Sequence, residues 1–144
     1  MKYKIQYFQP KEFVCKCCGG GMVVTRLVYS LDILRRAWDA PIKVNSGYRC
    51  ERHNKEVGGS PISRHLLGLA ADIAPVNPEL IGPFQTLVGY LFGRREGWEL
   101  KFYPSFVHLA VPREEKSLWC GGLWCGGLIN VSVTNATPAA SDIM

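Results

Sequence analysis

The sequence has no long hydrophobic run. The most apolar window, residues 80–92, is shorter than the roughly 20 residues that a membrane-spanning helix needs, and it contains Pro83. The N-terminal segment M-K-Y-K-I-Q-Y-F-Q-P has no apolar stretch of the length found in a secretory signal peptide. We therefore expect a chain that is synthesised in the cytoplasm, without a membrane span or a signal peptide.

The chain also lacks a long basic run interleaved with aromatic residues. Its 17 Lys and Arg against 12 Asp and Glu give a net charge of +5, but most of the basic residues are scattered along the chain. A net positive charge favours an anionic partner such as nucleic acid, acidic lipid or the bacterial wall, and does not choose among them. Without a basic groove in the pattern, no nucleic-acid partner is expected.

The chain lacks a further C-x-x-C pair that would complete its C-K-C-C cluster, although it has six cysteines. They fall in a C-K-C-C cluster, at one isolated position and in the pentapeptide L-W-C-G-G, which occurs twice. These residues are Cys15, Cys17, Cys18, Cys50, Cys120 and Cys125. Disulfides are not the default in a reducing cytoplasm, and the cluster lacks a second pair at the usual zinc-site spacing. We interpret the cysteines as reduced structural thiols. The alternative is a zinc knuckle which, with the net charge, would suit a nucleic-acid-binding module.

The sequence does contain an ordered series of helix and strand patterns within 144 residues, a length typical of one domain. Apolar spacing predicts a helix over residues 25–40, with Thr25 as its N-cap. Further patterns predict a strand from residue 42, a brief helix over 51–57, a helix over 80–91 interrupted at Gly82-Pro83, and strands over 98–103 and 106–111. In the last strand, His108 and Ala110 share one face.

Three histidines, His53, His65 and His108, are candidate metal ligands. His65 and Asp72 flank small residues, so their side chains are free to converge, and His108 lies among apolar neighbours where an unpaired imidazole would be costly. Two imidazoles and one carboxylate suit zinc with a fourth position left open. The alternative is that Asp72 caps a helix and the histidines have other partners. The spacing H-x(6)-D alone does not choose between these interpretations.

A series of motifs is more specific than any single spacing. S-G-Y-R, Asn54, V-G-G-S, S-R-H-L-L-G-L-A-A-D and F-V-H follow one another between residues 46 and 108. In this order and spacing the chain resembles the D-Ala-D-Ala carboxypeptidase-like zinc peptidases, which cleave peptides of bacterial peptidoglycan, and especially their small phage and bacterial members. The similarity covers residues 13–113, within a peptidase-like domain expected over residues 1–129. Residues 130–144 are expected to form a flexible tail.

The resemblance implies a site and a fold. Carried over position by position, it makes His65, Asp72 and His108 the ligands of one zinc ion. It also places Arg49 and Ser63 where the family binds substrate. For Arg49 the alternative is a structural pairing with an acid, and for Ser63 it is a capping hydroxyl. The expected fold is a small single α+β domain, with a short antiparallel sheet packed with helices around the zinc site.

The chain departs from the family pattern where a proton acceptor is expected. Many relatives have an acid three residues before the last histidine, where this chain has Ser105. The small relatives often have F-V-H-x-D, and this chain has Ala110 in place of that aspartate. Glu99, on the preceding strand, is the nearest sequence candidate for the general base. If the missing carboxylate matters, Ala110→Asp is expected to raise activity.

Two functions from different classes follow from these observations. The first is a zinc-dependent peptidase that hydrolyses stem peptides or cross-links of peptidoglycan, such as an endolysin or a wall-remodelling enzyme. The alternative is a zinc-binding, catalytically weak domain that binds wall peptides or serves structurally in a phage particle. In both cases a monomer is expected, acting at the wall or periplasm after holin-type release or carriage in a virion.

Overall fold

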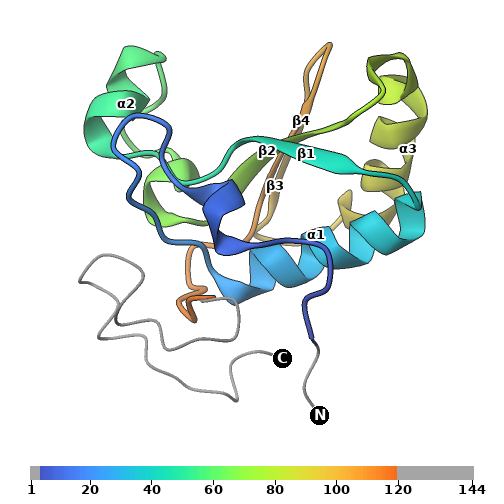
Figure 1. Ribbon diagram of the computed structural model, residues 1–144, viewed down its shortest axis with the longest axis horizontal. Coiled ribbons are helices and arrows are strands. Elements are labelled where there is room, and N and C mark those ends of the chain that lie inside the picture. The colour runs from blue at the N-terminus through green and yellow to red at the C-terminus, as the bar shows by residue number, and fades with distance from the viewer. Residues whose placement is uncertain (1–3, 120–144) are drawn as a thin grey trace.

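The computed structural model describes residues 4–119 of the chain. Within this range six helical elements and four strands form a single α+β domain (Figure 1). The family-like region predicted over residues 13–113 lies inside the described range. The L-W-C-G-G repeat cysteines Cys120 and Cys125, and the tail predicted over residues 130–144, lie outside it.

The centre of the domain is a four-stranded antiparallel sheet with the strand order β1-β2-β4-β3. The strands are β1 (Ile42–Ser46), β2 (Ala70–Pro75), β3 (Glu99–Phe102) and β4 (Val107–Ala110). Every residue of β2 is buried, as expected for an inner strand covered on both faces. The antiparallel sheet predicted from the sequence is confirmed.

Two longer helices, α1 (Thr25–Trp38) and α3 (Ile81–Phe92), pack against one another and against one face of the sheet (Figure 1). The hydrophobic core lies between them and alternate residues of the inner strands, including Ala71, Ile73, Val107 and Leu109. Because successive strand residues point to opposite faces, Asp72 and His108 are directed away from this core.

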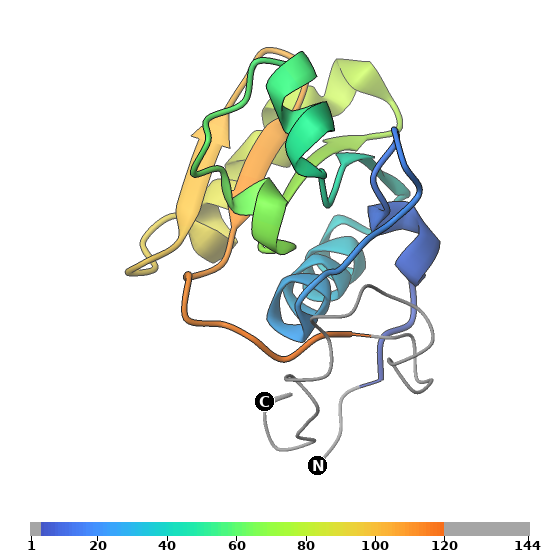
Figure 2. The same ribbon diagram turned by 90° about the vertical axis from the view of Figure 1, so that its left-hand side faces the viewer.

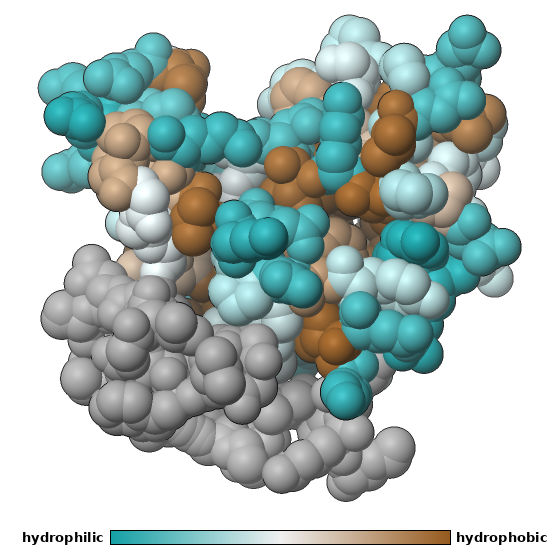
Figure 3. All heavy atoms as spheres, viewed as in Figure 1, coloured by the Kyte–Doolittle hydropathy of each residue, from teal (hydrophilic) through white to brown (hydrophobic). Residues whose placement is uncertain are grey.

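The opposite side of the sheet carries short elements. They are the helix α2 (Glu51–Glu56) and the 3-10 helix η2 (Arg64–Leu67), which contact one another and lie beside β2 and β4 (Figure 2). Two further 3-10 helices are η1 (Pro10–Phe13), near the start of the described chain, and η3 (Pro78–Leu80), directly before α3. In the space-filling view, the upper outline is notched between α2 and the tip of the β3–β4 hairpin (Figure 3).

Two local predictions about helix ends were wrong. Thr25 is not an N-cap: Val24 occupies that position, and the Thr25 backbone N–H donates to the Ser117 carbonyl at 2.7 Å. A backbone acceptor from a distant segment thus replaces the predicted side-chain cap. Gly82-Pro83 does not interrupt α3, because Pro83 lies in the first helical turn, where its missing N–H would have had no intrahelical partner.

Across residues 4–119, no helix combines the length and the apolar character required to cross a bilayer.

Candidate metal centre

Three elements bring the predicted ligands His65, Asp72 and His108 together. His65 lies on η2, Asp72 on β2 and His108 on β4, and the last two are directly opposite one another in the register of the sheet. One ligand atom from each residue lies within 4.8 Å of the others. The alternative in which Asp72 caps a helix is wrong, because Asp72 lies within a strand.

Both histidines present one ring nitrogen to the same carboxylate oxygen. Asp72 Oδ1 lies 3.2 Å from His65 Nε2 and 3.1 Å from His108 Nδ1. The other ring nitrogen of each histidine faces an acceptor: His65 Nδ1 is 2.7 Å from the Gly47 carbonyl, and His108 Nε2 is 2.9 Å from Glu99 Oε1. Each imidazole can therefore donate on its outer side and keep a lone pair directed at the centre of the group.

Asp72 remains ionised in this arrangement. Burial by itself would raise the pKa of Asp72, but hydrogen bonds and charge from His108 and His65 outweigh it and hold the pKa well below its usual range. The same contacts act on His108: burial lowers its pKa, and the carboxylates of Asp72 and Glu99 raise it overall. The group thus contains a fixed negative charge between two imidazoles, an arrangement that favours a bound cation.

Arg49 lies at the edge of the same group. Its Nη2 is 3.5 Å from Asp72 Oδ2, its Nη1 donates to Asn54 Oδ1 at 2.8 Å, and its Nε donates to Ser46 Oγ at 3.2 Å. Asn54 is itself buried and donates to the Ser60 carbonyl. The guanidinium is therefore held in a fixed orientation next to the candidate ligands. Its contact with Asp72 is a pairing with an acid, the structural alternative considered for Arg49.

Close backbone approach is required where Arg49 and Asn54 meet. At Gly59, an added Cβ would overlap Asn54 Oδ1 and lie 2.8 Å from Arg49 Nη1. Any side chain at this position would displace the guanidinium. Gly59 belongs to the sequence motif V-G-G-S, so the need for a glycine here could have been found from the sequence. The role of Asn54 in orienting Arg49 was not predicted.

Ser63 and Gly68 position His65 from the two ends of η2. The Ser63 hydroxyl accepts the His65 backbone N–H at 3.1 Å, which is the capping role left as the alternative for this serine. Gly68 ends η2 with φ +72°, and an added Cβ there would lie 2.5 Å from the Met22 carbonyl oxygen. Gly68 therefore combines a left-handed backbone conformation with a close contact. Substrate binding by Ser63 stays a prediction.

Glu99 reaches the site from the neighbouring strand. It pairs with Ala110 across β3 and β4, so its side chain starts directly opposite the position where the resemblance predicts an aspartate. Glu99 Oε1 contacts His108, and Oε2 lies 3.3 Å from Arg64 Nε. Burial raises the pKa of Glu99, but the His108 hydrogen bond and the Arg64 charge lower it overall, so the carboxylate is ionised. Ser105 is exposed in the turn between β3 and β4.

Comparison with known proteins places this geometry in a family. The family model described as Peptidase M15 matches residues 6–109, well over half of the chain. The chain belongs to the peptidase M15 family. The match confirms the resemblance to the D-Ala-D-Ala carboxypeptidase-like zinc peptidases and supports a metal-dependent peptide hydrolase. No curated protein matches the chain.

The residues present fit the zinc ion on which M15 peptidases depend. The donors are two imidazole nitrogens and one carboxylate oxygen, the set that zinc accepts when one position is kept for water or substrate. The outer nitrogens of both histidines are held by a carbonyl and a carboxylate, as is usual for histidine ligands of zinc. Asp72 supplies one negative charge against the two positive charges of the ion.

The M15 site predicts a characteristic pH dependence of stability when metal is removed. The pKa of Asp72 is depressed below 3.8, so its contribution is present above about pH 3.8 and is lost as the pH falls further. The pKa of His108 is raised above 6.5, so its contribution is present below about pH 6.5 and is lost as the pH rises through the raised pKa. We expect the unfolding temperature of chelator-treated protein to be highest between these limits.

Added zinc should offset the loss of stability that the metal-free protein shows at alkaline pH. Because zinc competes with the proton on His108, the rise in unfolding temperature on adding zinc is expected to be larger at about pH 8 than at about pH 5.5. Scanning fluorimetry of the chelated protein with and without zinc measures this difference. An equal zinc effect at both pH values would contradict ligation by His108.

Proposed function

We propose that this M15 protein is a zinc-dependent peptidase that hydrolyses peptide bonds in the stem peptides or cross-links of bacterial peptidoglycan. The observation that carries the proposal is the orientation of the two histidines. Each turns one nitrogen toward Asp72, while its other nitrogen faces an acceptor. Such an arrangement leaves two lone pairs and a carboxylate converging on one point, which suits a metal better than a hydrogen-bonded core cluster.

The role of each residue follows from its contacts. When bound, zinc supplies Lewis acidity, which lowers the pKa of water and polarises a scissile carbonyl. His65 Nδ1 and His108 Nε2 face acceptors, so a proton on each of these nitrogens would leave the inner nitrogens available as ligands. Asp72 stays ionised and pairs through Oδ2 with Arg49. Glu99 holds the proton on His108 Nε2 and fixes the plane of that ring.

Arg49 gives the proposal its substrate class. Asn54 and Ser46 fix two of its nitrogens, and its remaining contact with Asp72 is long, at 3.5 Å. A guanidinium held in this way at the side of a metal centre is suited to a carboxylate of a peptide, which it would bind by charge-assisted hydrogen bonds. Peptidoglycan stem peptides carry such carboxylates. We infer that Arg49 and Ser63 act on the substrate side of the site, and that the protein acts at the wall as a monomer.

A second candidate function is a zinc-binding domain that binds wall peptides with little turnover. The observation that favours it is the engagement of both Glu99 oxygens, one with His108 and the other with Arg64. Neither Ala110 nor Ser105 supplies another carboxylate. Of the described residues that contact the candidate ligands, none offers a free acid as a general base.

Digestion of purified peptidoglycan separates the two functions. The full-length protein is incubated with peptidoglycan, with and without a chelator, and the soluble products are analysed by mass spectrometry. For a peptidase we expect new peptide fragments that disappear with chelator and return when zinc is added back. The fragment masses also identify which bond is cut. Binding of peptidoglycan without any zinc-dependent fragment would instead support the second candidate.

A further inference from the structure

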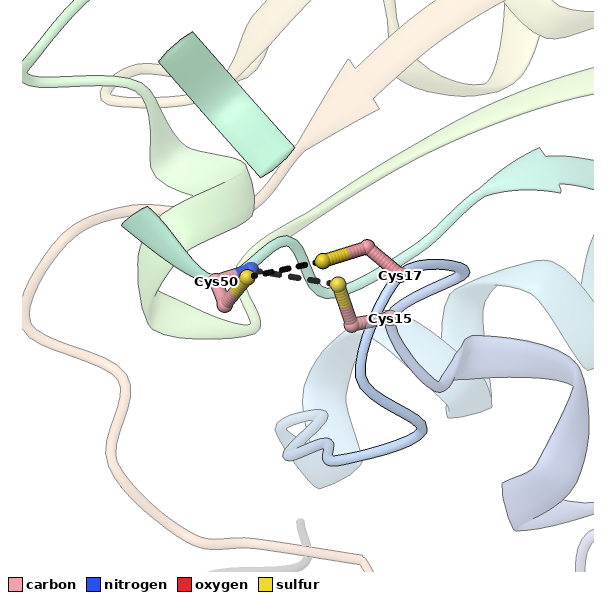
Figure 4. A group of neighbouring side chains, drawn as sticks. All are labelled: Cys15, Cys17 and Cys50. Carbon is pink, nitrogen blue, oxygen red and sulfur yellow. Dashed lines mark hydrogen bonds between the residues drawn. The ribbon is translucent and has the colours of Figure 1, made fainter. Parts of the chain in front are cut away.

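A second group of metal-binding side chains lies outside the histidine site. The thiols of Cys15, Cys17 and Cys50 approach one another so closely that their sulfur atoms all lie within 4.8 Å. Cys17 Sγ and Cys50 Sγ are 3.6 Å apart. Figure 4 shows Cys15 and Cys17 extending from the N-terminal loop toward Cys50, which directly precedes α2. The fold therefore supplies the partner that the C-K-C-C cluster lacks in the sequence.

Cys18 is the candidate fourth ligand. It directly follows Cys17 in the same loop, and its sulfur accepts the Gly20 backbone N–H. The compact group itself consists of Cys15, Cys17 and Cys50, of which Cys50 comes from a segment more than thirty residues away. Four sulfur ligands from such a group and its neighbour are characteristic of a structural zinc site.

The surroundings of the sulfurs suit thiolates. Each of the four accepts an N–H group: Cys15 from the Cys50 backbone at 3.4 Å, and Cys50 from the His53 backbone at 3.4 Å. The Gly20 backbone donates to Cys18 at 3.4 Å, and the Arg52 guanidinium donates to Cys17 at 3.2 Å. Four N–H donors, one of them a cation, oppose the mutual repulsion of neighbouring thiolates, which raises the pKa of Cys17 and of Cys18. The thiolate is the form that binds metal.

We propose that Cys15, Cys17, Cys18 and Cys50 bind a second zinc ion, separate from the one held by the histidine site. Zinc fits because it accepts four thiolates in tetrahedral geometry and has no redox chemistry of its own. Four thiolates and one zinc ion carry a net charge of minus two, which Arg52 partly offsets through its contact with Cys17.

This thiolate site would connect the N-terminal segment to the substrate side of the histidine site. Cys50 directly follows Arg49, and the loop before it is already tied to η1, because the Tyr48 N–H donates to the Phe13 carbonyl at 2.8 Å. The Gly47 carbonyl faces His65 Nδ1. Gly47 also lies so close to Phe13 that a Cβ added to Gly47 would be 2.7 Å from the Cα of Phe13. A metal ion at the cysteines would hold this loop, and Arg49 with it, in one position.

Metal analysis of the full-length protein, prepared under reducing conditions and dialysed to remove loosely bound ions, tests the proposal. We expect two zinc ions per chain in the wild type, one in Cys17→Ser and one in His65→Ala. Cys17 is chosen because it is only half-buried, whereas Cys15 is fully buried in the core. The double substitution Cys120→Ser/Cys125→Ser, which leaves the four-cysteine group intact, is the matched control and should retain two.

A spectroscopic measurement avoids the risk that Cys17→Ser does not fold. In His65→Ala, the remaining zinc should show a shell of sulfur neighbours at about 2.3 Å by X-ray absorption. A wild type with a single zinc that His65→Ala removes would overturn the thiolate site, as would a Cys17–Cys50 disulfide detected by mass under non-reducing conditions. Failure of the histidine site gives a different result, in which Cys17→Ser removes all zinc and His65→Ala removes none.

Discussion

Replacing His65 with alanine is expected to remove one zinc ion per chain and to abolish peptidoglycan hydrolysis. His65 is only 2% exposed, and its Nε2 contacts Asp72 on the side where the candidate ligands converge. Loss of a ligand should weaken zinc binding by more than the roughly 10–100-fold typical of losing an outer partner of a ligand. Zinc content after dialysis and fragment release from peptidoglycan measure the two effects.

Two further variants separate metal loss from damage to the fold. Asp72→Asn keeps the side-chain volume but removes the charge between the histidines, so it should also lose zinc and activity while retaining its circular dichroism spectrum. His53→Ala is the matched control, because His53 lies on α2 and pairs with Glu56 rather than with the candidate ligands. It should keep wild-type zinc content and activity. Full zinc content and hydrolysis in His65→Ala would refute the proposed centre.

Glu99→Ala is expected to weaken zinc binding at the histidine site, and adding Ala110→Asp to it is expected to restore that binding. Glu99 and Ala110 are direct partners across β3 and β4, and Glu99 Oε1 holds His108 Nε2. Glu99→Ala should lower zinc affinity about 10–100-fold, because His108 loses its orienting acceptor. In Glu99→Ala/Ala110→Asp, a carboxylate returns on the same face of the sheet, and we expect most of the affinity to return with it.

The single variants show whether Glu99 orients His108 or acts as the general base. Glu99→Gln retains an acceptor oxygen for His108 and should keep zinc with a modest loss of activity. A base would behave differently, with activity falling about 10²–10⁴-fold at unchanged zinc content. That outcome would support the role of general base predicted for Glu99 from the sequence, a role that stays a prediction. No recovery of affinity in the double variant would argue against the orienting role.

For Ala110→Asp alone, the structure leads us to expect lower stability rather than the higher activity predicted from the sequence. Ala110 is fully buried, and a new carboxylate there would lie directly opposite Glu99 in the strand pair. Like charges in that position destabilise an antiparallel pair. We therefore expect the single variant to unfold at a lower temperature than the wild type. The increase in activity predicted from the sequence should appear only when Glu99 is also replaced.

Much of the fold could be predicted from the sequence because its patterns are local. The apolar spacing of residues 27, 31 and 34 defines the buried face of α1, and all three leucines are fully buried. Turn residues delimited β3 and β4 closely. The predictions failed at helix ends such as Thr25, where the acceptor comes from Ser117, nearly a hundred residues away. A cap of that kind leaves no local signal.

The candidate metal ligands could be proposed from ordered motifs, but their partners could not. The sequence by itself determined which residues carry metal-binding chemistry, because an imidazole, a thiol or a carboxylate is a property of the residue. Only the tertiary structure decided which of them meet. Strand register sets Glu99 opposite Ala110 and beside His108, and the loop before α2 brings Cys50 to the C-K-C-C cluster. Both contacts join distant segments, and the packing of the sheet, rather than any local preference, sets their distances.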